Sequence, residues 1–106
     1  MIERHHYFRL KEPHGTPEGR ADIAERTMTA LAPLPGVLGV TVATPADDHA
    51  AAGWDLTVTV RFSSLEDVET YRADPDHRRF VDEVLGPRIA VKKIWNFTVV
   101  DESRTN

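Results

Sequence analysis

The alternating run WDLTVTVRF at residues 54–62 constrains the fold of this chain more than any other segment. Large apolar side chains occupy every second position, which is the period of a β-strand with one buried face. The face predicted to pack against helices consists of Trp54, Leu56, Val58, Val60 and Phe62. The opposite face is polar yet favourable for a strand, so it can contact solvent or a second sheet. It consists of Asp55, Thr57, Thr59 and Arg61.

Further strands are predicted on both sides of this one. They cover residues 3–11, 37–44 and 91–100. In the first of them, alternation places two polar and two apolar side chains on one face, namely Arg4, His6, Phe8 and Leu10. Residues 45–53, PADDHAAAG, are predicted as a flexible loop.

Capping residues mark the starts of the predicted helices. Thr16–Pro17 begins a helix that reaches about residue 31. Its inward stripe at helical spacing consists of Ile23, Ala24, Thr27, Met28 and Leu31. Ser63 and Glu66 form a capping box that begins a second helix, and Asp74–Pro75 begins another that continues to about residue 85.

The element order β-α-β-β-α-α-β predicts an α+β fold of the ferredoxin-like βαββ(αα)β type. In this fold a four-stranded antiparallel sheet carries helices on one face only. For a chain of 106 residues, we expect a single domain over residues 1–100 and a C-terminal tail over residues 101–106. The uncovered, threonine-rich sheet face suits a homodimer in which two sheets meet.

The charge of the chain argues against two classes of partner. The 13 Lys and Arg residues are outnumbered by 17 Asp and Glu residues, and the charges are scattered along the chain. Because nucleic acids and anionic membranes require a basic face, we expect neither as a partner. The sequence has no cysteine, no apolar run of the signal-peptide type and no segment of transmembrane length. A cytoplasmic protein is therefore expected.

Four segments together carry a family resemblance. FRLK, LPGV, WDLTVTVRFSSLEDVETY and DPDHRRFVDEVLGP cover most of the chain in order. With them the sequence resembles the Dabb family of stress-responsive dimeric α/β barrel domains. The resemblance implies a homodimer whose two sheets face each other to form a barrel, with a pocket between sheet and helices in each subunit. The family includes polyketide cyclases that perform an aldol ring closure, hydroxynitrile lyases, and members known only as stress-induced.

The resemblance also implies a pair of site residues. In the cyclases, a helix-borne tyrosine and a histidine six residues later form the acid/base pair, and these positions hold Tyr71 and His77. The chain departs from the family where many members read His-Pro-x-His, because here residues 74–77 read DPDH. A first-strand histidine found in many members aligns with Arg4, and His6 follows shortly after it.

The residues themselves favour an inward position for this pair. His77 shares one helix face with Phe80, and Tyr71 lies on the inward face of the preceding helix. The break at Asp74–Pro75 is expected to bring both side chains into one space above the sheet. The helix dipole and burial both favour a neutral imidazole, which can accept a proton, while the phenol can hold a carbonyl oxygen. The pocket around them is predicted to include Arg4, His6, Phe8, Leu56, Val58, Val60 and Phe80.

Alternative functions follow from these observations. The first is an acid/base enzyme without cofactor or metal, acting on a small phenolic or polyketide-like carbonyl compound as a cyclase or related C–C lyase. The second is a non-catalytic, stress-responsive homodimer that binds a hydrophobic ligand or only itself, with Tyr71 and His77 only packing. A roomy pocket favours the first, and a pocket filled by Phe8, Trp54 and Tyr71 favours the second. A cofactor-free monooxygenase on the related barrel fold rests on fold analogy alone.

Neighbouring histidines do not make a metal site on a strand. His5 and His6 point to opposite faces, so they cannot bind one ion together, and no metal site is predicted.

Overall fold

The strands and helices follow the predicted order. The computed structural model describes residues 1–103. The strands are β1 (Ile2–Leu10), β2 (Gly39–Ala43), β3 (Leu56–Phe62) and β4 (Ile89–Thr98). The helices are α1 (Pro17–Leu31), α2 (Asp48–Gly53), α3 (Leu65–Ala73) and α4 (Pro75–Phe80). A π-helical turn (Val81–Leu85) and a 3₁₀ turn (Gly86–Arg88) connect α4 to β4. In residues 1–103 no helix is long and apolar enough to cross a membrane.

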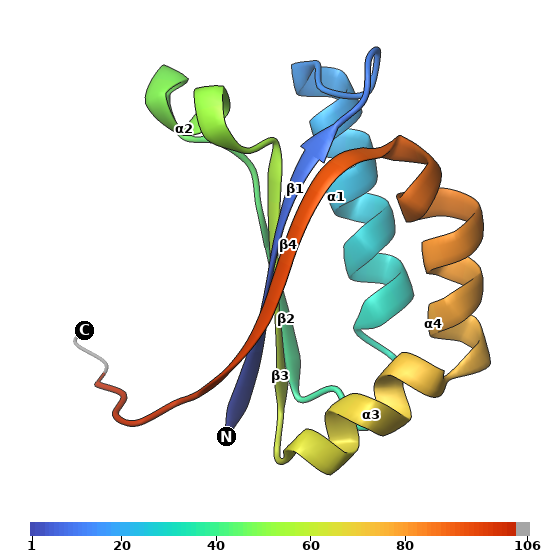
Figure 1. Ribbon diagram of the computed structural model, residues 1–106, viewed down its shortest axis with the longest axis vertical. Helices are drawn as coiled ribbons and strands as arrows, with labels where there is room; N and C mark the ends of the chain where they lie inside the picture. The colour runs from blue at the N-terminus through green and yellow to red at the C-terminus, as the bar shows by residue number, and fades with distance from the viewer. Residues whose placement is uncertain (104–106) are drawn as a thin grey trace.

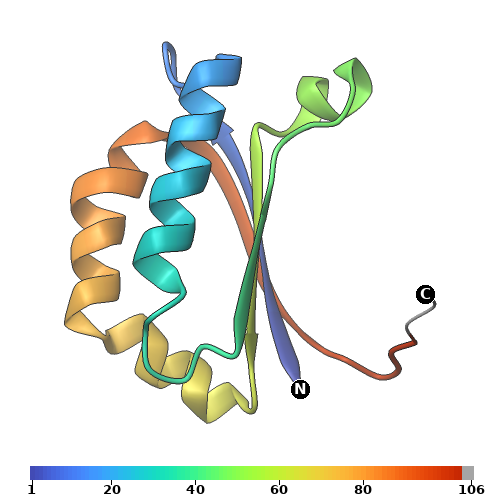
Figure 2. The same cartoon turned by 180° about the vertical axis from the view of Figure 1, so that it is seen from behind.

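The sheet is four-stranded with the order β2-β3-β1-β4, and all of its pairs are antiparallel. Helices α1, α3 and α4 cover one face, while α2 lies on the other side of the sheet (Figures 1 and 2). This arrangement confirms the predicted ferredoxin-like fold. On the helix-covered face, rows of neighbours cross β3, β1 and β4 as Val60–Arg4–Asn96, Val58–His6–Ile94 and Leu56–Phe8–Lys92.

The residues before β3 differ from the alternation seen in the sequence. Trp54 follows α2, and its ring lies 5.8 Å from that of Tyr7, on the sheet face that the helices leave uncovered. Asp55, predicted as a polar outer residue, is buried and forms an ion pair with Arg20 at 2.8 Å. Its carboxylate also accepts a hydrogen bond from the Leu10 N–H at 2.7 Å. The strand therefore begins only at Leu56, after the chain has turned to make these contacts.

Short-range capping explains the other local differences. The predicted loop at residues 45–53 contains helix α2, because Asp47 caps it by accepting a hydrogen bond from the Ala50 N–H at 2.8 Å. At the start of α3 the cap is Ser64 rather than Ser63, and its hydroxyl accepts from the Asp67 N–H at 3.2 Å.

The segment after α4 does not continue as a regular α-helix to residue 85. Pro87 lacks an N–H and cannot continue an α-helical ladder. Gly86 instead donates its N–H to the Val81 carbonyl, and a Cβ at Gly86 would meet that oxygen at 2.6 Å. Only glycine fits this close approach. Two residues of the resulting π-helical turn, Val81 and Leu85, line the cavity described below.

The sheet face without helices remains partly apolar. On β4 the side chains of Val91, Trp95 and Phe97 are 48%, 50% and 50% exposed. At one end of this face Arg61 pairs with Glu3 at 3.0 Å and with Glu102 of the C-terminal segment at 2.7 Å. Residues 104–106 of the predicted tail lie outside the described residues.

Candidate active site

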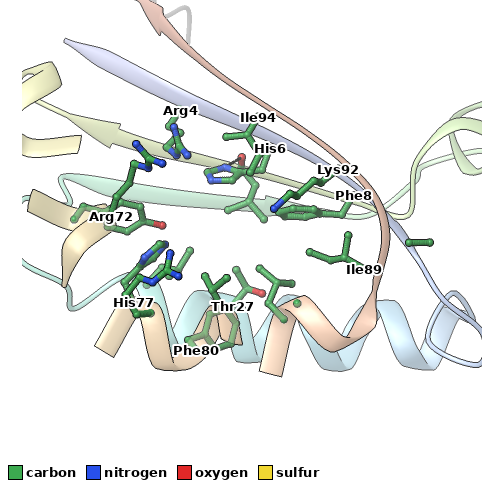
Figure 3. A pocket seen from close by; sticks show the side chains of 18 residues that line it. Arg4, His6, Phe8, Thr27, Arg72, His77, Phe80, Ile89, Lys92 and Ile94 are labelled. Atoms are coloured by element: carbon green, nitrogen blue, oxygen red, sulfur yellow. Dashed lines mark hydrogen bonds between the residues drawn. The ribbon is translucent and has the colours of Figure 1, made fainter. Parts of the chain in front are cut away.

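A cavity of about 430 Å³ lies between the sheet and the helices. Most of the side chains predicted for the site line it, namely Arg4, His6, Phe8, Val58, Tyr71, His77 and Phe80 (Figure 3). Leu56 and Val60 do not line it, and the two are 1% and 0% exposed in the core. The cavity lies over β1 and β4 and reaches β3 only at Val58, so the prediction for these two residues was wrong.

Other lining residues were not singled out from the sequence. They include Thr27 of α1, Arg72 and Arg78 of the broken helix, and Lys92 and Ile94 of β4. The sequence indicates an unusual role for Thr27, because it is a polar residue within the apolar stripe of α1. The sequence also indicates the position of Lys92, since alternation along β4 places it on the same face as Ile94.

Asp74 holds Tyr71 and His77 together at the break between α3 and α4. Its backbone N–H donates to the Tyr71 carbonyl at 3.2 Å, which ends α3. Its carboxylate accepts from the N–H groups of Asp76 and His77 at 2.8 and 3.3 Å, which starts α4. Because one residue caps both helices, the ring centroids of Tyr71 and His77 lie only 4.2 Å apart, at an interplanar angle of 47°.

Three buried polar atoms in residues of the cavity wall have no partner in the described part of the chain. Thr27 Oγ1, Tyr71 Oη and His77 Nδ1 are buried and form no hydrogen bond within residues 1–103. Buried polar atoms are paired in more than about 90% of cases, because an unpaired one loses its hydration without compensation. All three atoms belong to residues that line the same cavity.

The protonation states of Tyr71 and His77 are opposite and complementary. Burial raises the pKa of the Tyr71 phenol, and the nearby Arg4 charge only partly opposes this effect. Burial lowers the pKa of His77, as do the charges of Arg4 and Arg78, while the Arg72 carbonyl and Asp74 act in the opposite direction. At neutral pH the phenol therefore keeps its proton and the imidazole is free to accept one.

His6 is a weaker candidate for the base. Its Nδ1 lies 2.9 Å from the Val58 carbonyl oxygen, which can only accept, so Nδ1 carries the proton and Nε2 the lone pair. Burial lowers the pKa of His6 to about 4. A general base works best when its pKa lies near the operating pH, so His77 is better suited to remove a proton. His6 is suited to accept a hydrogen bond from a ligand.

His5 and His6 lie on opposite faces of the sheet, as the strand period predicts. His5 contacts Glu3 at 3.0 Å and the Phe97 ring at 4.9 Å on the uncovered face. Within residues 1–103 no group of three or more His, Asp or Glu side chains is placed to hold a metal ion.

Comparison with solved structures gives the same fold at low sequence identity. A Dabb family protein with a ferredoxin-like fold from Mesorhizobium loti is 16% identical, with a TM-score of 0.77 over 94% of this chain and 97% of that one. A dimeric ferredoxin-like protein of unknown function from Thermobifida fusca is 20% identical, with a TM-score of 0.74 over 92% and 90%. The hydroxynitrile lyase from Passiflora edulis is 17% identical, with a TM-score of 0.74 over 97% of both chains.

No curated protein matches the sequence. The family model of the stress responsive A/B barrel domain, Dabb, matches residues 2–101, which is nearly the whole chain. The chain therefore belongs to the Dabb family of stress responsive A/B barrel domains.

Proposed function

We propose that this protein is an acid/base enzyme that acts on a small carbonyl compound without a cofactor, as a cyclase performing an aldol-type ring closure or as a related C–C lyase. The observation that carries the proposal is the pair Tyr71 and His77. Their rings lie 4.2 Å apart, and the hydroxyl of one and Nδ1 of the other are unpaired within residues 1–103. One holds a proton and the other can accept one.

In the proposed ring closure His77 first removes a proton and later returns it, and Tyr71 stabilises the negative charge that forms between these two steps. The neutral His77 ring removes a proton from the carbon next to a ketone, while the Tyr71 hydroxyl donates a hydrogen bond to the ketone oxygen and stabilises the enolate. The enolate carbon attacks a second carbonyl of the same molecule and forms the C–C bond. The imidazolium of His77 then returns its proton to the new alkoxide. In the lyase direction His77 removes the hydroxyl proton and the resulting alkoxide becomes a carbonyl as the C–C bond breaks. The departing carbanion then takes the proton back from the imidazolium of His77.

Proton exchange at a ketone tests this proposal without knowledge of the natural substrate. The probes are 4-acetylbenzoate and its methyl ester, incubated with the protein in D₂O. We expect deuterium to enter the acetyl methyl group, followed by NMR, at least about 10²-fold faster than with an equal concentration of free imidazole. A rate equal to that of imidazole for both probes would contradict the proposed function.

One observation favours the non-catalytic alternative. The Tyr71 side chain is 1% exposed, as expected of a residue that mainly packs. Against this, the cavity is not filled by Phe8, Trp54 and Tyr71, and Trp54 does not line it. A ligand-binding dimer would bind the ketone probes and leave their methyl protons unexchanged.

The uncovered sheet face supports a homodimer. Trp95 and Phe97 are both 50% exposed there, and the Thermobifida fusca neighbour is described as dimeric. We expect the protein to sediment at micromolar concentration with twice the 11.9 kDa mass of one chain. Trp95→Lys should shift it to the monomer, because a charge would be buried between the sheets. Leu65→Lys, which places the same charge at an exposed apolar position of α3, should remain dimeric. A monomeric wild-type protein would contradict the sheet-to-sheet dimer.

A further inference from the structure

The charged side chains that line the cavity all have the same sign. They are Arg4, Arg72, Arg78 and Lys92, and no Asp or Glu among residues 1–103 lines the cavity. The chain as a whole carries a net charge of −4, so the cavity differs in sign from the rest of the protein. A cavity with such a lining attracts an anion and repels a cation.

The positive side chains of the cavity differ in how far neighbouring carboxylates neutralise their charge. Arg72 pairs with Glu69 at 3.3 Å and Arg78 with Asp82 at 3.7 Å, and the side chains of both pairs are more than half exposed. Such surface pairs contribute little and exchange readily with other partners. Arg4 is half-buried and donates only to the neutral Asn96 Oδ1 at 3.0 Å, with no ion pair within residues 1–103.

Two of the guanidinium groups lie close together at one end of the cavity. Arg4 extends from β1 and Arg72 from the end of α3, and their side chains point toward one another beside His77 (Figure 3). Burial lowers the pKa of Arg4 most, and the Arg72 charge lowers it further, while Tyr71 and the Glu69 carboxylate act in the opposite direction. The repulsion between the two guanidinium groups is relieved when an anion lies between them, because each guanidinium can then donate charge-assisted hydrogen bonds to it.

We propose that the natural ligand carries an anionic oxygen group, a carboxylate or a phosphate, which binds between Arg4 and Arg72 while its carbonyl lies at Tyr71 and His77. This inference rests on the proposed function, because it assumes that the cavity is the substrate site. A cavity of about 430 Å³ fits one small acid, which makes a polymer or a protein segment an unsuitable occupant.

Calorimetry with three aryl ketones that differ in one group tests the anion site. The probes are 4-acetylbenzoate, its methyl ester and 4-acetylphenyl phosphate. We expect at least one anion to bind wild-type protein about 10-fold to 100-fold more tightly than the ester. A preference for the acid identifies a carboxylate site, and a preference for the phosphate identifies a phosphate site. Equal binding of all three probes, or binding of none at millimolar concentration, would overturn the inference.

Three variants assign the preference to Arg4. Arg4→Gln should remove the preference for the anion and leave the affinity for the ester unchanged. Asn96→Asp should do the same with Arg4 still present, because the new carboxylate would neutralise its charge at the same 3.0 Å contact. Arg26→Gln removes an exposed arginine from α1, outside this cavity, and should bind all three probes as the wild type does. A preference that persists in both Arg4→Gln and Asn96→Asp would contradict the assignment.

The same probes separate this inference from the proposed function. Preferential binding of an anion without exchange of the methyl protons would overturn the enzyme and leave the anion site. Exchange that is equal for acid and ester, with equal affinities, would overturn the anion site and leave the enzyme.

Discussion

Replacing His77 with glutamine is expected to lower the rate of methyl-proton exchange in the ketone probes by about 10²- to 10⁴-fold, the usual contribution of a general base. Glutamine fills similar space and forms hydrogen bonds, but it does not accept a proton at neutral pH. Because the backbone contact of residue 77 with Asp74 does not depend on its side chain, the helix start should survive. NMR exchange rates and thermal unfolding of both proteins measure the two effects.

A matched variant controls for the loss of a histidine as such. His49 lies exposed in α2, on the other side of the sheet from the cavity (Figure 1). His49→Gln should exchange the probes at the wild-type rate. Retained exchange in a folded His77→Gln protein would show that His77 only packs, and it would remove the base from the proposed mechanism.

Replacing Tyr71 with phenylalanine is expected to separate activity from stability. The exchange rate should fall by about 10²- to 10³-fold, as when a donor to a developing oxyanion is removed. The free energy of unfolding should stay the same or rise by about 1 kcal/mol, because the buried hydroxyl has no partner within residues 1–103 and its removal ends an uncompensated loss of hydration. Urea unfolding and the exchange assay on the same samples measure both quantities.

Tyr7→Phe provides the comparison for this substitution. Tyr7 lies on the uncovered sheet face between Trp54 and Trp95, with ring distances of 5.8 and 6.1 Å. Removing its hydroxyl should leave the exchange rate unchanged. If Tyr71→Phe instead lost more than about 1 kcal/mol of stability and kept its exchange rate, the Tyr71 hydroxyl would be a structural group with a partner in solution.

Local periodicity predicted most of what positions this site. Alternation in β1 placed Arg4, His6 and Phe8 on one face, and the structure puts all three at the cavity. The cap and proline at residues 74–75 predicted the helix break, because both act on the local backbone and need no tertiary information. Pairing of Tyr71 with His77 follows from that break.

The remaining features depend on contacts that a one-dimensional pattern does not contain. Leu56 and Val60 share the sheet face of Val58, yet only Val58 reaches the cavity. The cavity lies over β1 and β4, and this position is set by how the helices lie on the sheet. Arg72 of α3 and Lys92 of β4 both line the cavity, although these two elements are distant in sequence. Short-range chemistry was also missed at α2, where the Asp47 cap was present in the sequence but was interpreted as part of a loop.

The pH dependence of the exchange rate tests the central claim, that a neutral His77 and a protonated Tyr71 act together, most directly. The rate per bound probe should rise with pH, with a midpoint below the ordinary histidine value of 6.5, because burial lowers the pKa of His77 and only the neutral ring accepts a proton. It should then stay constant up to pH 10 after subtraction of the hydroxide background, since burial raises the pKa of Tyr71 above 10.0. A midpoint above pH 6.5, or a rise that persists unchanged in His77→Gln, would contradict the claim.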